Sequence, residues 1–283
     1  MPAAGSKRAS LWDHGLHWEN WSKRCANGQC ATTPFKSIFH GKGIQFSGDW
    51  FCSVPCLEFD LQRSLARLAG AAPPAEAPRP SRFPLGLVLY SRGFLNAEQF
   101  KIALEQHRSS GSRIGDVALQ LGFVNEEQVA LALSAQWGYP LLPSKSIPAQ
   151  LPLLVPAHLM EIHQMLPIQF TEETQKLLLA FATRIDYSAL HGIEQMLACV
   201  AEPCFVTMSE FRSRMQALPE KRREAEFVFD RISNPLEMAE IVKSYVAQTA
   251  AEEVRICPCH EYLWVRVISA RQSLDLLFRL QAG

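Results

Sequence analysis

One pattern of apolar and polar residues occurs twice near the middle of the chain. Residues 84–107 read PLGLVLYSRGFLNAEQFKIALEQH, and residues 113–136 read RIGDVALQLGFVNEEQVALALSAQ. The segments align without a gap, nine of the 24 paired positions are identical, and five residues, RSSGS, separate them. In each copy the apolar residues recur at helical spacing, first over a short stretch and then over a longer one. The pattern therefore predicts two helical hairpins of the same design.

Turn and cap residues mark the same boundaries in both copies. Gly93 and Gly122 follow the short apolar stretch, and glycine accepts the left-handed conformation in which many helices end. Asn96 and Asn125 come next, each with a glutamine three positions later, which is the pattern of a capping box. We therefore expect a second helix to begin after each asparagine.

A glycine inside each short helix is also repeated. Gly86 and Gly115 occupy the same position of the two copies, although glycine in a helix interior costs about 1 kcal/mol relative to alanine. Because this cost occurs twice, we expect another backbone or a ligand to approach closely at both positions.

The rest of the chain divides by composition. We expect an α/β (α+β) protein in which the tandem helical-hairpin repeat packs on a small α/β domain, with further pieces on either side. The final piece, one helix and three strands, has a thin core of its own, so it should pack on the middle domain or on a partner. The expected parts are 1–66, a zinc-ribbon-like or treble-clef-like module; 67–82, an Ala/Pro-rich linker; 83–218, the repeat with its α/β half; 219–235, a charged linker; and 236–283, a short α-β-β-β segment.

Helices and strands alternate after the repeat. A helix near the end of this region should begin at Ser209, which is a plausible N-cap. Cys199 and Cys204 flank an apolar strand and are expected to be buried thiols of the core. Three histidines without metal-ligand spacing are expected at the surface or at helix ends: His158, His163 and His191.

Charge and hydropathy restrict the classes of partner. The chain has 283 residues, with 28 Lys and Arg balanced by 28 Asp and Glu, so no overall field attracts nucleic acid. An anionic ligand must therefore meet a local cluster of donors, and we expect no DNA partner. No apolar run approaches the roughly 20 residues of a membrane span, and the first residues lack the pattern of a secretory signal. The sequence predicts a cytoplasmic protein without membrane insertion.

Four cysteines near the N-terminus have the spacing of a metal site. Cys25 and Cys30 form one close pair, and Cys52 and Cys56 form a second pair about 20 residues later. Two such pairs are typical of a structural zinc ion with four thiolate ligands and no open position. Zinc can contribute on the order of 10 kcal/mol to folding a segment too small for a full core. The alternatives are four free thiols, or replacement of one thiolate by a histidine: His14, His17 or His40.

The repeat resembles a known domain. The two copies and their five-residue spacer resemble the MshEN domain, whose pattern is RLGxxLxxxGxxxxxxLxxxLxxQ given twice. This is the GspE N-terminal kind of domain found in many type II secretion and type IV pilus assembly ATPases. The resemblance implies that each copy binds half of the two-fold symmetric ligand cyclic di-GMP. In the second copy the matching residues are Arg113, Ile114, Gly115, Ala118, Gly122, Val129, Leu133 and Gln136. In the first copy they are Leu85, Gly86, Leu89, Gly93, Phe100, Leu104 and His107.

The first copy departs from this pattern at two polar positions. Pro84 stands where arginine is expected, and His107 stands where glutamine is expected. Proline suits the first turn of a helix, so the fold is kept while a cation is lost. Arg82 lies two residues upstream and is a candidate replacement.

Three functional hypotheses remain from the sequence. No G-x-x-x-x-G-K-[ST] motif for a nucleoside triphosphate occurs, so the first is a non-catalytic, cyclic-di-GMP-responsive adaptor related to the ATPases. The second is a ligand-free interaction module that docks on a type II secretion or type IV pilus apparatus. The third is an enzyme that uses Cys257, Cys259 and His260, although a strand-to-strand turn with incidental cysteines explains that cluster better.

Overall fold

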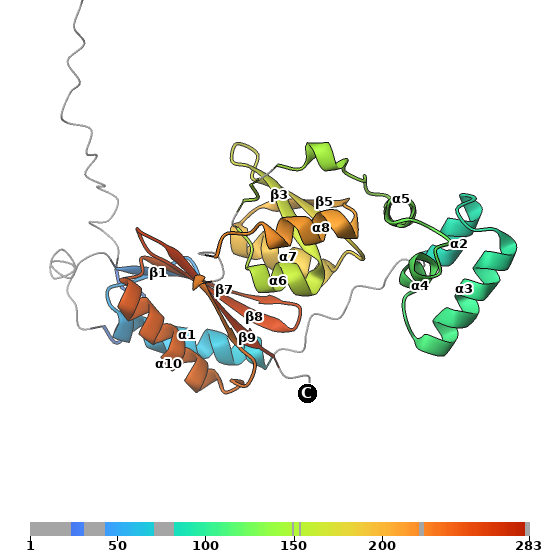
Figure 1. Cartoon of the computed structure of the whole chain (residues 1–283). Helices are drawn as coiled ribbons and strands as arrows, with labels where there is room; N and C mark the ends of the chain where they lie inside the picture. Colours follow the sequence, from blue (N-terminus) through green and yellow to red (C-terminus); the bar gives the residue numbers. More distant parts are fainter. Residues whose placement is uncertain are drawn as a thin grey trace, which may run out of the picture.

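The computed structural model describes residues 24–30, 43–70, 82–148, 150–152, 154–220 and 224–280. They form a helical repeat, a small α/β unit and a second, larger sheet (Figure 1). The architecture is mixed α/β, as predicted.

The repeat folds as two helical hairpins of the same design. They consist of α2 Leu85–Ser91 and α3 Ala97–Ser110, followed by α4 Ile114–Gln120 and α5 Glu126–Trp137. Gly93 and Gly122 follow the short helices with φ of 72° and 69°. Asn96 and Asn125 each form a capping box with the glutamine three residues later. The predicted boundaries of the hairpins are confirmed.

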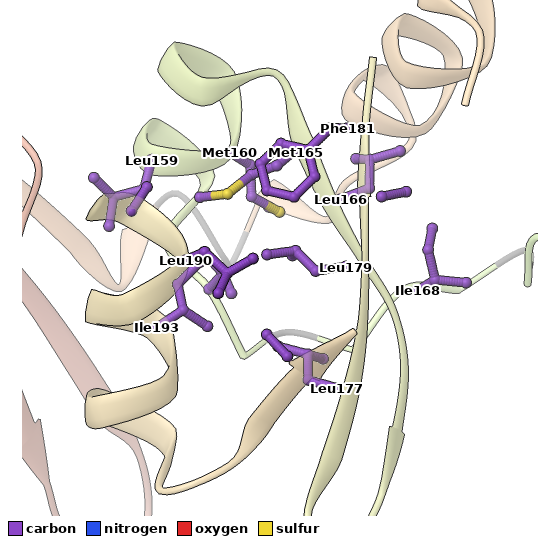
Figure 2. Close-up of a cluster of buried hydrophobic side chains, with 14 of the residues drawn as sticks. Leu159, Met160, Met165, Leu166, Ile168, Leu177, Leu179, Phe181, Leu190 and Ile193 are labelled. Carbon is purple, nitrogen blue, oxygen red and sulfur yellow. The ribbon is translucent and has the colours of Figure 1, made fainter. Parts of the chain in front are cut away.

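The α/β unit is built on a three-stranded sheet in the order β3-β4-β5. Its strands are β3 Met165–Thr171, β4 Lys176–Phe181 and β5 Val200–Phe205. Its helices are α6 Ala157–His163, α7 Tyr187–Leu197 and α8 Met208–Gln216, and a short 3-10 helix, η3 Ser144–Ser146, precedes them. β3 runs antiparallel to β4, whereas β4 and β5 are parallel and joined through α7. Leucine and isoleucine side chains of α7 and the sheet form its core (Figure 2).

One detail of this unit differs from the sequence prediction. The N-cap of α8 is Thr207, whose hydroxyl accepts from the amide of Glu210, so the prediction of Ser209 is wrong. His163 is buried but is the last residue of α6, and His191 is exposed, which agrees with the prediction of histidines at helix ends or at the surface. Cys199 and Cys204 are buried thiols, which confirms the prediction for both.

The second sheet has six strands in the order β2-β1-β7-β8-β9-β6. They are β1 Ile44–Phe46, β2 Asp49–Phe51, β6 Glu226–Phe229, β7 Glu253–Cys259, β8 Tyr262–Ile268 and β9 Ser273–Arg279. Two helices, α1 Val54–Ala69 and α10 Pro235–Thr249, lie side by side over one face (Figure 1).

Residues from the two ends of the chain share this sheet, which differs from the expected division into separate parts. β1 pairs in parallel with β7, with Gln45 opposite Glu253 and Phe46 opposite Val254. α1 continues to Ala69, past the expected module boundary at 66, and β6 lies inside the expected linker 219–235. Residues 44–69 and 226–279 therefore form one unit, because neither segment has enough apolar surface for a core alone.

The six-stranded sheet is covered on both faces. Along β8, Leu263 and Val265 face the core beneath α1 and α10, while Tyr262 and Trp264 face the α/β unit. Side chains of a strand alternate between its faces, which explains why six successive residues of β8 are buried. α7 approaches closely here, since a Cβ atom on Gly192 would lie 2.7 Å from the carbonyl oxygen of Pro258.

A buried ion pair fixes the contact between this sheet and the α/β unit. The guanidinium of Arg266 donates to Asp275 at 2.7 and 3.0 Å and to the carbonyl oxygen of Leu154 at 2.7 Å. Trp264 donates its indole N–H to the same carboxylate at 2.8 Å. Because each partner is hydrogen-bonded, the charges are tolerated in the core.

No helix within the described ranges is both long and apolar enough to cross a membrane.

Candidate functional site

The two copies of the repeat are interlocked. Ile114 of the second copy lies over Gly86 of the first, where a Cβ atom would come within 2.5 Å of its Cδ1. Leu85 of the first copy lies over Gly115 of the second in the same way, at 3.2 Å. The glycines are therefore approached by side chains of both copies, and not by another backbone, which was one of the two alternatives that the sequence suggested.

The helices also pack across the two copies. α2 packs on α5, and α4 packs on α3, so the short helix of each copy lies on the long helix of the other. Since the packing at Gly86 has its counterpart 29 positions later at Gly115, the two hairpins are related by an approximate two-fold axis. Such an arrangement presents two equivalent surfaces at once.

Several of the predicted ligand residues form the core of the repeat instead. Leu89 and Ala118 are fully buried and pack together with Leu95 and Ala132. The glycines at 86 and 115 and the side chain of Leu133 are also buried. Partly exposed residues remain available to a ligand: Leu85, Phe100, Leu104, His107, Ile114, Val129 and Gln136. Gly93, Gly122 and Arg113 are exposed.

The two copies begin in the same conformation but with different chemistry. Pro84 and Arg113 are the N-caps of α2 and α4, with φ/ψ of −54°/136° and −63°/141°. Across the described part of the chain, the guanidinium of Arg113 has no hydrogen-bond or ion-pair partner. The second copy therefore offers a free guanidinium where the first offers a proline ring.

Arg82 is already engaged. Its guanidinium carbon lies 3.4 Å from the ring centroid of Trp137, and Nη2 donates to the hydroxyl of Tyr187 at 3.1 Å. Trp137 ends the repeat and Tyr187 begins α7, so this arginine joins the repeat to the α/β unit. No local sequence pattern indicates this contact, because the three residues are far apart in the chain.

The last residue of each copy contacts the backbone just before the first residue of the other copy. His107 Nδ1 lies 2.5 Å from the carbonyl oxygen of Ser112, and Gln136 donates from Nε2 to the carbonyl oxygen of Phe83 at 2.7 Å. Positions 107 and 136, like 83 and 112, are equivalent in the alignment. The same contact is thus made twice, by two different kinds of side chain.

One face of the first copy is apolar where the second is polar. Phe83, Leu87 and Tyr90 are 78%, 41% and 46% exposed. Their equivalents in the second copy are Ser112, Asp116 and Leu119. Because the second copy folds in the same way without them, Phe83 and Leu87 are not required for the hairpin fold.

The four N-terminal cysteines converge in space. The sulfur atoms of Cys25, Cys30, Cys52 and Cys56 all lie within 4.8 Å of one another. Two of the pairs, Cys30–Cys52 and Cys52–Cys56, are 3.6 Å apart. Sulfurs placed 2.3 Å from a tetrahedral centre are about 3.8 Å apart, so the geometry fits a zinc ion.

The local structure explains how the two cysteine pairs are presented. Cys52 follows β2 and Cys56 lies in the first turn of α1, while the amide of Ala26 donates to the carbonyl of Trp50 and holds the first pair beside the second. Burial, with smaller effects from the neighbouring thiols, raises the pKa of the Cys56 thiol to about 12. The alternative ligands His14, His17 and His40 lie outside the described residues.

The C-terminal cysteine and histidine cluster does not form a common site. Cys257 and Cys259 point into the core and donate to the carbonyl oxygens of Gly192 and Ala189 in α7, and burial raises the pKa of Cys257 to about 12. His260 lies in the turn after β7 and contacts Asp186 through Nδ1 at 3.1 Å. The thiols are structural, which disfavours the hypothesis of an enzyme built on them.

Asp186 was missed by the sequence analysis although it connects three elements. It caps α7 by accepting from the amides of Ser188 and Ala189, and its second carboxylate oxygen contacts His163 and His260 at 3.3 and 3.1 Å. Burial alone would raise the pKa of Asp186, but the hydrogen bonds and the histidine charges hold it well below its usual range. An Asp directly before an amphipathic helix was the available signal.

Comparisons with known proteins agree with the resemblance carried by the repeat. No protein-family model matches the chain. Over 129 residues, 45% of this chain, it is 30% identical to the type IV pilus assembly ATPase PilB of Thermus thermophilus, and the match covers 14% of that protein. The chain therefore spans about a seventh of the length of this curated relative.

Two solved structures have a similar arrangement. The solved structure of MshE with cdg is 23% identical to this chain in sequence. The match covers 48% of this chain and 98% of that chain, with a TM-score of 0.41. The N-terminal domain of XpsE is 16% identical, with 47% and 92% covered and a TM-score of 0.38. Over the matched region, this chain is therefore similar to part of a type IV pilus assembly ATPase.

Proposed function

We propose that this chain is a non-catalytic signalling or adaptor protein whose helical repeat binds one molecule of cyclic di-GMP. Proteins of the secretion or pilus assembly machinery would then recognise the bound form. The observation that supports this proposal most is the reciprocal packing of Ile114 on Gly86 and of Leu85 on Gly115. A site with approximate two-fold symmetry matches a ligand made of two identical halves.

In the proposed site, the side chains have distinct roles. Arg113, exposed and without a partner in the described residues, would contact a phosphate or a guanine edge, for which a guanidinium fork is suited. The partly exposed Leu85, Ile114 and Val129 would pack against the bases. Leu89 and Ala118 are buried and would shape the site from beneath.

Calorimetric titration of the full chain with cyclic di-GMP tests the proposal. We expect one ligand per chain and a loss of about tenfold or more in affinity on Arg113→Ala, since a charged hydrogen bond contributes about 1.5–3 kcal/mol. Arg63→Ala is the matched control, because Arg63 is an exposed arginine on α1. Absence of binding at tens of micromolar ligand would contradict the proposal and leave the fold unaffected.

A second candidate function is docking on a protein of the secretion or pilus apparatus without a nucleotide. The exposed apolar side chains of Phe83, Leu87 and Tyr90, in a copy that has lost its arginine, favour it. Phe83→Ser with Leu87→Asp, which restores the residues of the second copy, is the discriminating variant. It should abolish capture of the apparatus proteins if docking is the function, and cyclic di-GMP should then be without effect.

We also propose that Cys25, Cys30, Cys52 and Cys56 hold a structural zinc ion. The convergence of four sulfurs at tetrahedral spacing supports it. Metal analysis of the purified chain should give about one zinc per chain, and Cys52→Ser should lose it while Cys199→Ser, a buried cysteine outside the cluster, retains it. Less than half an equivalent of zinc in the unaltered chain would contradict the assignment.

A further inference from the structure

The contacts at the ends of the two copies have a consequence for the predicted ligand residues His107 and Gln136. His107 contacts the carbonyl oxygen of Ser112, and Gln136 donates to the carbonyl oxygen of Phe83. Both side chains are directed to a backbone group of the repeat itself. Ser112 directly precedes the first residue of the second copy, and Phe83 directly precedes the first residue of the first copy.

The position of that carbonyl determines how the next residue is oriented. The carbonyl of Ser112 and the amide nitrogen of Arg113 belong to one planar peptide unit. Holding the oxygen fixes the orientation of this plane, and the plane fixes where the Cα and side chain of Arg113 begin. The side chain of Arg113 is exposed and has no partner in the described residues, so its direction depends on its backbone, which the contact at Ser112 holds together with the first hydrogen bond of α4.

We propose that His107 is a positioning residue for Arg113, and that Gln136 has the same part at the start of the first copy. His107 then reproduces the contact of a glutamine, and the departure from the repeat pattern at position 107 preserves its function. This inference rests on the proposed binding of cyclic di-GMP for its consequence, but its geometry is independent of the ligand.

The chemistry of the contact gives a test without any ligand. A carbonyl oxygen only accepts, so Nδ1 of His107 must carry the proton. In the neutral imidazole, Nε2 is then unprotonated. Nitrogen-15 spectra of histidine-labelled full chain at mildly alkaline pH, assigned with His107→Gln, should show the Nδ1–H tautomer, and the Nε2–H tautomer would overturn the inference.

A second test follows the backbone at Arg113. His107→Gln should leave the amide signals and the backbone order of residues 112–114 as they are, because glutamine can make the bond. His107→Leu and His107→Asn should both loosen this segment, because leucine has no donor and the side chain of asparagine is too short to reach the carbonyl oxygen. Glu105→Ala, at an exposed position two residues earlier in α3, is the control. Unchanged order in both disruptive variants would contradict positioning.

Ligand titration separates positioning from direct contact. His107→Gln should bind cyclic di-GMP within about threefold of the unaltered chain, and His107→Leu about tenfold more weakly. The double variant with Arg113→Ala should be no weaker than Arg113→Ala alone, since His107 acts through that arginine. Additive losses would overturn the inference in favour of direct contact. If the unaltered chain binds no cyclic di-GMP, the proposed function fails while the tautomer and backbone measurements still judge this inference.

Discussion

Ile114 occupies the space that a side chain at Gly86 would need. A Cβ atom at position 86 would lie 2.5 Å from Cδ1 of Ile114 and 2.9 Å from Cε2 of Phe100. Gly86→Ala should therefore lower the free energy of unfolding by about 1–2 kcal/mol, because overpacking exceeds the helix propensity gained by alanine. Urea unfolding measures this, and Ile114→Val should relieve part of the loss in the double variant.

Gly115 is the control for this prediction. The nearest atoms to a Cβ atom there are Cδ2 of Leu85 at 3.2 Å and Cγ1 of Val129 at 3.4 Å, both at the ends of aliphatic side chains. Gly115→Ala should change stability by less than Gly86→Ala. Equal losses for the two variants would contradict the described packing.

Arg82 should stabilise the contact between the repeat and the α/β unit. Its guanidinium stacks on Trp137 and donates to Tyr187, and a cation–π contact of this kind contributes about 0.5–2 kcal/mol. Arg82→Ala should lower the free energy of unfolding by about 1 kcal/mol and alter the fluorescence of Trp137. Arg82→Lys should restore little of either, since lysine lacks the planar fork.

Acid should weaken the contacts of Asp186. Because its pKa is lowered in the folded chain, this carboxylate contributes stability that is fully present above its unfolded pKa of about 3.9 and is lost as the pH falls below that value. Asp186→Asn keeps the helix cap but removes the charge. We expect it to unfold at lower urea concentration at pH 6 and to show a smaller further loss below pH 4 than the unaltered chain. Asp116→Asn, an exposed carboxylate of α4, should behave like the unaltered chain.

Asp275 should be among the most sensitive positions of the six-stranded sheet. It is fully buried and neutralises Arg266, and removing one partner of such a pair typically costs about 3–5 kcal/mol. Asp275→Asn should therefore lower the melting temperature sharply. Glu261→Gln, which breaks the exposed pair with Arg279, should change the free energy of unfolding far less, because water screens a pair at the surface. Similar effects of the two variants would contradict this description of the core.

Zinc removal should loosen one end of the same sheet. The cysteine cluster lies next to β1 and β2, and β1 pairs with β7 through Gln45 and Phe46. Chelation should speed amide exchange in residues 44–51 well before it does so in β8 and β9, because β8 also packs on α10 and β9 pairs with both β8 and β6. Uniform exchange across the sheet after chelation would argue against a metal at this place.

Local sequence signals account for the parts of the fold that were predicted. The capping boxes at Asn96 and Asn125 and the glycines after α2 and α4 act within a few residues, so the repeat could be read directly. The pairing of β1 with β7 joins segments about 200 residues apart, and no local pattern specifies such a partner. β6 was not predicted because it is only four residues long and lies within a charged stretch.

The candidate site was predicted to a similar extent. Spacing alone brought together the four cysteines, because metal ligands must be close in pairs. In the repeat, the pattern could not predict the burial of Leu89 and Ala118 or the backbone contacts of His107 and Gln136, since both depend on how the two copies interlock.

Chemical-shift mapping of the nitrogen-15-labelled chain with cyclic di-GMP tests most directly whether the two hairpins act as one site. We expect saturable changes at the starts of both short helices together, at Leu85–Gly86 and at Ile114–Gly115, with a single dissociation constant. Changes confined to one copy, or none at millimolar ligand, would contradict the account.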